Sequence, residues 1–458
     1  MPQKTPHSIA VIDVGATNAK VVHFAPDLSV LGERTAPVAR TGGPPYLHLD
    51  PDGIIAFATK AIRAFDRVQP VDAIVPCTHG SALALVDAGG GLALPMMSYL
   101  AEVPGEVAAQ YARIEPPFSE VLAPVNPGAL TLARQLLWQE MRFADGFGKV
   151  EAIMPYAQYV AFHLSGVMAA ERSALGAQTQ LWAPAAGTYS SLARARGWDR
   201  LMAPLHPAGV VLGAAKSLRL SGRGAVHCGV HDSNANFFRY AGLAPLVLLS
   251  TGTWIIAFDS DAPLDGLDSR LDQASNTTVT GRPVACARFM GGEEYARIAG
   301  AGNNTVPDPG RVAALVRAET MALPSFTASG GPVPETGGKG RITGPAPETD
   351  ADRAALAALY TAQMTALASD ALGSTEKVVV DGPFAANAAF CGVLAALMPG
   401  RNIYRSASGS GTAAGAAALA LAGGPPPPRL EPARPAAIDG LAAYHRRWRR
   451  AVDDLQSA

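Results

Sequence analysis

The sequence predicts an α/β protein built from two domains, and three observations carry this prediction. First, 458 residues exceed the size of one ordinary core, which favours two domains of ~200 residues each. Second, strand-like and helical patterns alternate: Ser8–Val14 and Val71–Cys77 are apolar runs typical of buried strands, and Asp50–Val68 between them has helical spacing. Third, a strand, a small polar turn and a second strand occur at Asp13 and again at Gly252, as expected for a duplicated domain.

The composition excludes several classes of protein. Hydrophobic residues make up 48% and charged residues 16%, which fits a globular enzyme with large buried sheets. Lys and Arg (37) nearly balance Asp and Glu (38), so the chain lacks the basic field that nucleic-acid binding requires. The four cysteines have no CxxC spacing, which argues against a zinc site or disulfides. Apolar runs fall far below the ~20 residues that span a bilayer. We therefore expect a cytoplasmic protein that binds neither nucleic acid nor membrane.

The first polar turn follows the strand that begins at Ser8. Gly15 lets a ligand approach the backbone closely. Asp13, Thr17 and Asn18 place a carboxylate, a hydroxyl and an amide at one edge, and Lys20 adds a cation. Such a turn can hold a metal-bound triphosphate, although an ordinary polar hairpin turn explains the same residues equally well.

A polar segment, His227–Asn236, lies near the middle of an otherwise apolar chain and contains one carboxylate, Asp232. Two interpretations remain open from these residues. Asp232 caps the helix that follows, which is the commoner role for an Asp at such a place, or it accepts the proton of a substrate hydroxyl. His79 follows the strand that ends at Cys77, where sheets of this class usually contact substrate, but a lone His is more often a structural hydrogen-bonding residue.

The second half repeats these features. Leu246–Thr251 is an apolar strand that leads into the turn Gly252-Thr253-Trp254. Lys377–Val380 predicts a strand, and the turn after it, Asp381–Asn387, precedes a predicted helix, Ala388–Leu397. A turn followed by a helix N-terminus offers free backbone N–H groups and a favourable dipole to an anion or adenosine.

Two features near the C-terminus receive structural interpretations. Ser408–Ala422 predicts a helix of small residues that packs closely on a sheet or a nucleotide, and Ile438–Leu455 predicts a basic amphipathic helix on the surface.

The tripeptide Gly338-Lys339-Gly340 is not a P-loop, because Val333 stands where the first glycine is required.

Together these strings resemble the FGGY carbohydrate kinases of the sugar kinase/Hsp70/actin superfamily, over about residues 9–420. The strings that carry the resemblance are Asp13-x-Gly15-x-Thr17-Asn18-x-Lys20, Gly229-Val230-His231-Asp232, Ser250-Thr251-Gly252-Thr253, Asp381-Gly382-Pro383-Phe384-Ala385-Ala386-Asn387 and Ala414-Gly415-Ala416-Ala417. Each string alone is weak, but their order along the chain is hard to match by accident. Two departures stand out: Pro383 replaces a glycine and removes a backbone donor, and the segment after Tyr99 lacks the Asp-x-Arg common in the family.

The resemblance implies two ribonuclease H-like (actin/hexokinase-type) domains with mixed sheets flanked by helices and a cleft between them. The expected ranges are 1–240 for sugar binding and the catalytic base, 241–430 for the nucleotide, and 431–458 for a C-terminal surface helix. The implied reaction is ATP-dependent phosphorylation of a sugar hydroxyl, with Asp232 as general base and a ketose (pentulose or deoxyhexulose) as the expected substrate.

The resemblance also implies the residues of the site. The residues expected to bind the sugar are His79, Gly80, Tyr99, His231 and Asp232. The residues expected to bind ATP are Asp13, Thr17, Asn18, Lys20, Gly252, Thr253, Gly382, Pro383, Asn387 and Gly415. The residues expected to hold Mg²⁺ are Asp13 and Asp232.

Two alternatives from other classes stay open: a non-catalytic sugar- or nucleotide-sensing relative, and an Hsp70-like ATPase. The sequence does not identify the sugar or the hydroxyl. A homodimer is the prior for the oligomeric state, because twofold dimers are the commonest oligomers.

Overall fold

The computed structural model describes residues 6–328, 331–407 and 411–457, and its contacts divide the chain into two compact units. Unit 1 comprises Met1–Gly242, Ser275–Pro283 and Thr412–Pro427. Unit 2 comprises Leu243–Ala274, Val284–Gly411 and Pro428–Ala458. The first passage between the units lies close to the predicted boundary at residue 240. Two segments within the predicted range 241–430, Ser275–Pro283 and Thr412–Pro427, have most of their contacts in unit 1.

Unit 1 is built on a seven-stranded mixed sheet in the described part of the chain. Its order is β12 (Val211–Ala214), β13 (Ala225–His227), β6 (Ala73–Thr78), β1 (Ile9–Val14), β2 (Asn18–Phe24) and β3 (Val30–Pro37), with β14 (Val230–His231) paired to β6. The smaller strands are β4 (Arg40–Thr41), β5 (His48–Leu49), β7 (Leu83–Val86), β8 (Leu92–Leu94), β9 (Ala152–Pro155), β10 (Trp182–Ala183) and β11 (Thr188–Tyr189).

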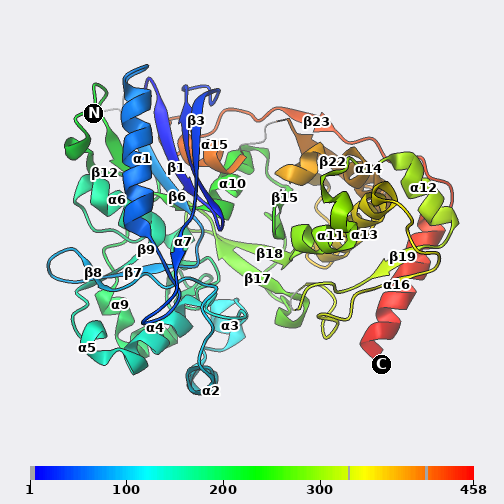
Figure 1. Cartoon of the computed structure of the whole chain (residues 1–458), viewed down its shortest axis with the longest axis horizontal. Helices are drawn as coiled ribbons and strands as arrows, with labels where there is room; N and C mark the ends of the chain where they lie inside the picture. The colour runs from blue at the N-terminus through cyan, green and yellow to red at the C-terminus, as the bar shows by residue number, and fades with distance from the viewer. Residues whose placement is uncertain (1–5, 329–330, 408–410, 458) are drawn as a thin grey trace. The chain divides into compact units, whose positions relative to one another are not determined.

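Helices cover both faces of this sheet, as the alternation of buried side chains along β1 requires. Ala10 and Ile12 pack in the same core as α1 (Pro51–Asp66) and α6 (Tyr156–Ser165). Ile9 and Val11 pack with α10 (Asp232–Tyr240) and α15 (Gly411–Ala418), which lie side by side in Figure 1. The other helices of unit 1 are α2 (Gly105–Ile114), α3 (Phe118–Val121), α4 (Leu132–Arg142), α5 (Ala144–Phe147), α7 (Arg172–Leu175), α8 (Ser191–Arg196) and α9 (Trp198–Leu201).

A second seven-stranded mixed sheet among the described residues belongs to unit 2 except at β17, most of which is assigned to unit 1. Its order is β17 (Gln273–Thr277), β18 (Pro283–Phe289), β16 (Ile255–Asp259), β15 (Val247–Thr251), β21 (Lys377–Asp381), β22 (Asn402–Ser406) and β23 (Leu430–Pro432). The short strands β19 (Met321–Leu323) and β20 (Arg341–Thr343) form a separate pair. The helices are α11 (Gly291–Ala299), α12 (Pro309–Arg317), α13 (Asp350–Asp370), α14 (Ala388–Leu397) and α16 (Leu441–Ser457).

The two sheets share one topology. The series β3-β2-β1-β6-β13-β12 corresponds strand for strand to β18-β16-β15-β21-β22-β23. In both series the first two pairings are antiparallel, the next two parallel and the last antiparallel. This correspondence supports the duplication predicted from the two strand–turn–strand patterns, and both sheets have the mixed, helix-flanked architecture that the resemblance implied.

Helix α16 is the amphipathic helix predicted near the C-terminus, and the structure shows which side of it is buried. Its residues Leu441, Tyr444, Trp448 and Val452 are buried in the core of unit 2. The Trp448 indole donates a hydrogen bond of 2.8 Å to the carbonyl oxygen of Ala322. One side of the helix therefore packs in the core, as an amphipathic surface helix does.

Replacing Trp448 with Phe is expected to lower the free energy of unfolding by about 1–3 kcal/mol, because the buried Ala322 carbonyl loses its donor. The midpoint of thermal unfolding measures the change. Arg450→Ala on the exposed side of α16 is the matched control, expected within about 0.5 kcal/mol of the parent. Equal midpoints for Trp448→Phe and the parent would contradict the assignment of α16 to the core.

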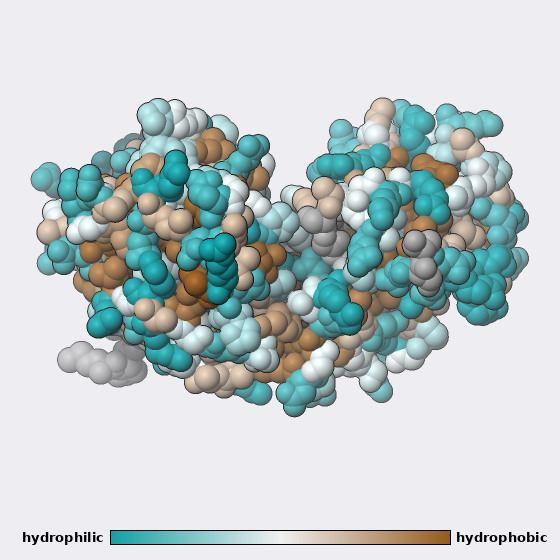
Figure 2. All heavy atoms as spheres, turned by 90° about the horizontal axis from the view of Figure 1, so that it is seen from below, coloured by the Kyte–Doolittle hydropathy of each residue, from teal (hydrophilic) through white to brown (hydrophobic). Residues whose placement is uncertain are grey.

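The surface has side chains of mixed hydropathy, and the helices are those of a globular fold. On the face shown in Figure 2, hydrophilic side chains are interspersed with hydrophobic ones over both units. Among the helices in the described ranges, none is long and apolar enough to cross a membrane.

Candidate active site

Three strand ends bring the predicted residues of unit 1 to one edge of its sheet. Strands β1 and β14 both run parallel to β6, with Val14 and His231 each opposite Thr78. The carboxyl ends of parallel strands meet at the same edge. Three features that are far apart in the sequence are therefore neighbours: the polar turn after β1, His79 after β6, and Asp232 after β14.

The turn after β1 is closed by a hydrogen bond of 3.0 Å from the Gly15 amide to the Asn18 carbonyl. Thr17 and Asn18 are exposed, so their side chains are free to meet a ligand. Burial, the charge of Asp232 and, more weakly, that of Glu33 raise the pKa of Asp13 to about 7, against the lowering effect of Lys20. Lys20 also forms an ion pair of 3.6 Å with Glu33, and both side chains are largely exposed. A surface pair of this kind is worth at most ~1 kcal/mol, so a phosphate can compete for Lys20.

His79 is buried with a defined tautomer. Its Nδ1 accepts a hydrogen bond of 3.3 Å from the Ser81 amide, so in the neutral ring the proton lies on Nε2. Burial lowers the pKa of His79 to about 4, which keeps the ring neutral at neutral pH. The rings of Tyr99 and Tyr156 each contact it edge-on at 5.6 Å. The adjacent Gly80 leaves room for His231, whose Cδ2 would lie 2.7 Å from an added Cβ.

Asp232 is the first residue of α10, and His231 is the N-cap. The predicted capping role therefore needs a small correction: Asp232 lies in the first helical turn, where the macrodipole favours a carboxylate. Its Oδ1 accepts a hydrogen bond of 2.6 Å from the Ser233 amide and lies 3.1 Å from Nε2 of His231. Burial lowers the pKa of His231, against the raising effect of Asp232. The carboxyl is only part-buried, so a substrate hydroxyl can reach it.

The carboxylates of Asp13 and Asp232 fit a magnesium ion by their chemistry. They act on each other electrostatically, which a shared cation would relieve. Mg²⁺ commonly takes one or two carboxylates and completes its shell with phosphate oxygens and waters. Among the residues that the structure describes, no group of three or more His, Cys, Asp or Glu side chains could hold a metal alone. Phosphate and water would have to supply the other ligands.

Arg40 belongs to this neighbourhood, and the sequence analysis missed it. Its guanidinium donates to the Ala16 carbonyl in the turn and to the Tyr99 hydroxyl. It also acts on the charge of His79. No motif marks this residue, since it reaches the turn from the separate strand β4.

In unit 2 a cavity of about 450 Å³ lies where β15 and β21 end. These strands are parallel, with Ser250 opposite Asp381, so their following turns are adjacent. The Thr251 hydroxyl joins the two turns. It donates a hydrogen bond of 2.6 Å to the Asp381 carbonyl and accepts one of 3.2 Å from the Phe384 amide. The Gly252 amide bonds the Trp254 carbonyl at 2.8 Å, much as Gly15 bonds Asn18. The predicted residues Gly252, Thr253, Pro383 and Asn387 line the cavity.

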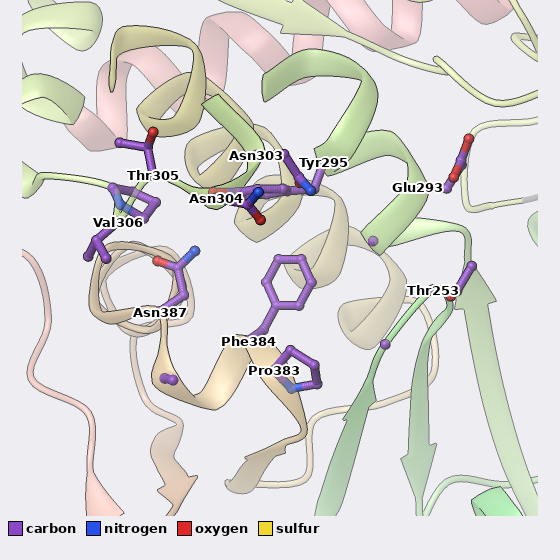
Figure 3. Close-up of a pocket in the computed structure, with 14 residues that line it drawn as sticks. Thr253, Glu293, Tyr295, Asn303, Asn304, Thr305, Val306, Pro383, Phe384 and Asn387 are labelled. Atoms are coloured by element: carbon purple, nitrogen blue, oxygen red, sulfur yellow. The ribbon is translucent and has the colours of Figure 1, made fainter. Parts of the chain in front are cut away.

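Aromatic and polar side chains both line the cavity. The rings of Phe384 and Tyr295 meet edge-on at 5.4 Å, and Figure 3 shows the Phe384 ring pointing toward Tyr295. An adenine ring can pack on such a surface. The polar residues that line the cavity and that the sequence analysis missed are Glu293, Asn303, Asn304 and Thr305. Glu293 lies in α11 and the other three residues follow that helix, and no periodicity of the sequence reveals that they line one cavity with the turn after β21.

The proline at position 383 removes no hydrogen bond within the short helix that begins there. It occupies the first position of a short 3₁₀ helix, Pro383–Ala386, where an amide would have no partner within the helix. Asn387 accepts from the Phe390 amide at 3.0 Å and caps α14. The side chain predicted to meet adenosine thus also begins a helix.

Gly415 belongs to unit 1 by its contacts. It is part of α15 in unit 1, where an added Cβ would overlap the Ala235 carbonyl of α10. Close packing of these two helices accounts for the glycine, and Gly415 does not line the described cavity in unit 2. The predicted start of this helix, residues 408–410, lies outside the described residues.

The two sheets of equal topology, each with a polar turn after a buried strand, define a duplicated α/β fold. A family model described as "Carbohydrate kinase FGGY, C-terminal domain" matches residues 243–428. A carbohydrate kinase from Novosphingobium aromaticivorans shares 30% identity, with a TM-score of 0.87 over 98% of this chain and 99% of that one. The chain belongs to the FGGY carbohydrate kinase family, and it is an ATP-dependent carbohydrate kinase, a phosphotransferase that acts on sugar hydroxyls.

More distant solved structures share the fold. Xylulose kinase from Lactobacillus acidophilus has 13% identity and a TM-score of 0.81, over 98% of each chain. Glycerol kinase from Plasmodium falciparum, solved with ADP, has 13% identity and a TM-score of 0.74, over 90% of this chain and 88% of that one. The comparison with curated proteins finds no match. Membership in a kinase family sets aside the two alternatives, a sensor and an Hsp70-like ATPase.

Proposed function

We propose that the protein transfers the γ-phosphoryl group of ATP to a hydroxyl of a small ketose, with Asp232 as the general base. The observation that carries this proposal is the position of Asp232: a part-buried carboxylate at a helix start, electrostatically coupled to Asp13 in the polar turn. The ketose is suggested by the xylulose kinases among the structural relatives.

In the proposed step Asp232 orients the substrate hydroxyl and accepts its proton while the new O–P bond forms. The bond between the γ-phosphorus and the bridging oxygen breaks, and ADP leaves. Thr17, Asn18 and Lys20 would bind phosphates from one turn, and Gly252 and Thr253 from the other. The cavity in unit 2 would hold adenosine against Phe384 and Tyr295. Positioning and charge stabilisation supply most of the rate enhancement in such transfers.

The decisive experiment incubates the protein with ATP, Mg²⁺ and a panel of ketoses, aldoses and polyols, and follows ADP with a coupled assay. ADP formation that depends on a ketose is the expected result. ADP formation that depends only on an aldose would retain Asp232 as base and reject the ketose. Absence of sugar-dependent ADP across the panel would contradict the proposed reaction.

Asp13 and Asp232 would hold Mg²⁺, and the ion would neutralise negative charge on the transferring phosphoryl group. Chelation with EDTA is expected to abolish ADP formation, and added Mg²⁺ to restore it. Asp13→Asn is expected to raise the Mg²⁺ concentration for half-maximal activity by about 10–100-fold, as loss of a metal-supporting carboxylate does elsewhere. A magnesium titration of the variant measures the shift, and an unchanged midpoint would remove Asp13 from the metal site.

A homodimer remains a prediction, and sedimentation velocity of the purified protein would test it.

A further inference from the structure

Arg40 is a cation whose partners are neutral. Its guanidinium donates to the Ala16 carbonyl and to the Tyr99 hydroxyl, and neither oxygen carries a charge that offsets its own. Its Nε is buried and has no hydrogen-bond partner among the described residues. A buried donor of a charged group costs free energy unless a ligand or water pairs with it.

His79 presents a second donor of the same kind. Because Nδ1 accepts from the Ser81 amide, Nε2 carries the hydrogen. This Nε2 is also buried and lacks a partner in the part of the chain that the structure describes. Tyr99 touches both residues, through its hydroxyl to Arg40 and through its ring to His79 at 5.6 Å. The two unused donors therefore belong to one neighbourhood, beside Asp232.

We propose that Arg40 Nε and His79 Nε2 form a two-donor site that binds an sp² oxygen of the sugar, either a ketone or a carboxylate oxygen. This inference rests on the proposed function and deepens it, since it names the chemical group that selects the substrate. Arg40 would be a specificity-determining residue that no motif of the sequence marks.

The preference for an sp² oxygen follows from the balance of donors and acceptors. A ketone or carboxylate oxygen offers two lone pairs and brings no hydrogen. A hydroxyl at the same place brings a hydrogen that needs an acceptor, and the proposed mechanism already commits the Asp232 carboxylate to the reactive hydroxyl. The positive charge of Arg40 further favours an oxygen with negative or strongly polarised character. An alditol, which has only hydroxyls, should therefore bind poorly.

The test compares ketoses, aldonates and alditols matched in carbon number and configuration, with five and six carbons. The parent protein is expected to show kcat/KM at least about 100-fold higher for a ketose or an aldonate than for the matched alditol. Whichever of the two is turned over faster identifies the source of the oxygen. Arg40→Met is expected to reduce this ratio to below about 5-fold. Any effect of the lost Ala16 contact on ATP binding cancels, because both sugars are compared at the same ATP concentration. Arg40→Lys keeps the charge but loses the planar fork, and an intermediate ratio is expected.

Controls separate binding from structure. Arg34→Met removes an exposed arginine from β3, outside the site, and should leave the ratio unchanged. If Arg40→Met does not fold, Arg40→Lys carries the test. A parent protein that uses the alditol equally well would overturn the two-donor site and leave the kinase proposal standing. Equal loss for ketose and alditol in Arg40→Met would also overturn it, since that pattern indicates a structural role. Absence of sugar-dependent ADP in the parent would overturn both proposals.

Discussion

The Asp232→Asn variant is expected to retain ATP binding at saturating Mg²⁺ but to lower kcat by about 10²–10⁴-fold. An asparagine amide has nearly the same shape as the carboxylate and can still accept from the Ser233 amide through its oxygen. It cannot accept the proton of the substrate hydroxyl. A loss confined to kcat is the signature of an interaction made in the transition state.

Steady-state kinetics with the best sugar of the panel, together with calorimetric titration of ATP, measure the two halves of this expectation. Asp52→Asn is the matched control, since Asp52 is also a carboxylate in the first turn of a helix, α1, but is exposed. The control should retain full turnover. Near-normal turnover in Asp232→Asn would remove Asp232 from the role of base, whatever sugar is used.

The strand–turn–strand patterns were sufficient to predict the duplicated architecture. Apolar runs that end in a small polar turn occur at β1 and β15, and the structure places both at the same point of equivalent sheets. Local sequence carries this information because a buried strand and a tight turn each restrict composition strongly. The same argument predicted that Gly382 and Asn387 follow a strand and start a helix.

The passages between units could not be predicted in this way. Ser275 donates its amide to the Leu122 carbonyl at 2.7 Å, and Gly415 packs on Ala235. Both are contacts between segments far apart in the sequence, and nothing in the local composition distinguishes these two segments of unit 1 from the neighbouring segments of unit 2. Arg40 was missed for the same reason, since its partners at Ala16 and Tyr99 come from other elements.

Two finer details of the helices also have local signals in the sequence. Leu441, Tyr444, Trp448 and Val452 have the spacing of one buried helical face, which identifies the side of the amphipathic helix that packs on the core. The sequence of Ser190–Met202 predicts one helix, whereas the structure has two there, α8 and α9. Gly197 separates them with φ of +72°, a left-handed conformation that ends a helix.

Gly382→Ala is expected to weaken ATP binding by at least about 10-fold, or to unfold unit 2, because the turn after β21 has no room for a methyl group. Gly382 has φ of +89° and ψ of −166°, a region that is essentially restricted to glycine and costs other residues about 1–3 kcal/mol. An added Cβ would also overlap the Thr251 carbonyl and lie 2.8 Å from the Thr251 hydroxyl. That hydroxyl joins the two turns of the cavity, so relief of the overlap must separate them.

The strain and the overlap can be distinguished with one matched variant. Gly400 has φ of +91°, but an added Cβ there would meet nothing within 4 Å. Gly400→Ala should therefore show only the conformational cost, as a lower unfolding midpoint with unchanged ATP affinity. Gly382→Ala is expected to lower both the unfolding midpoint and the affinity for ATP, and Gly400→Ala to lower the midpoint alone. That result would show that the contact between Gly382 and Thr251 holds the two turns of the nucleotide cavity together. If both variants keep the parent's affinity, the cavity of unit 2 does not depend on that contact, and adenosine must be bound by residues other than those of the two turns.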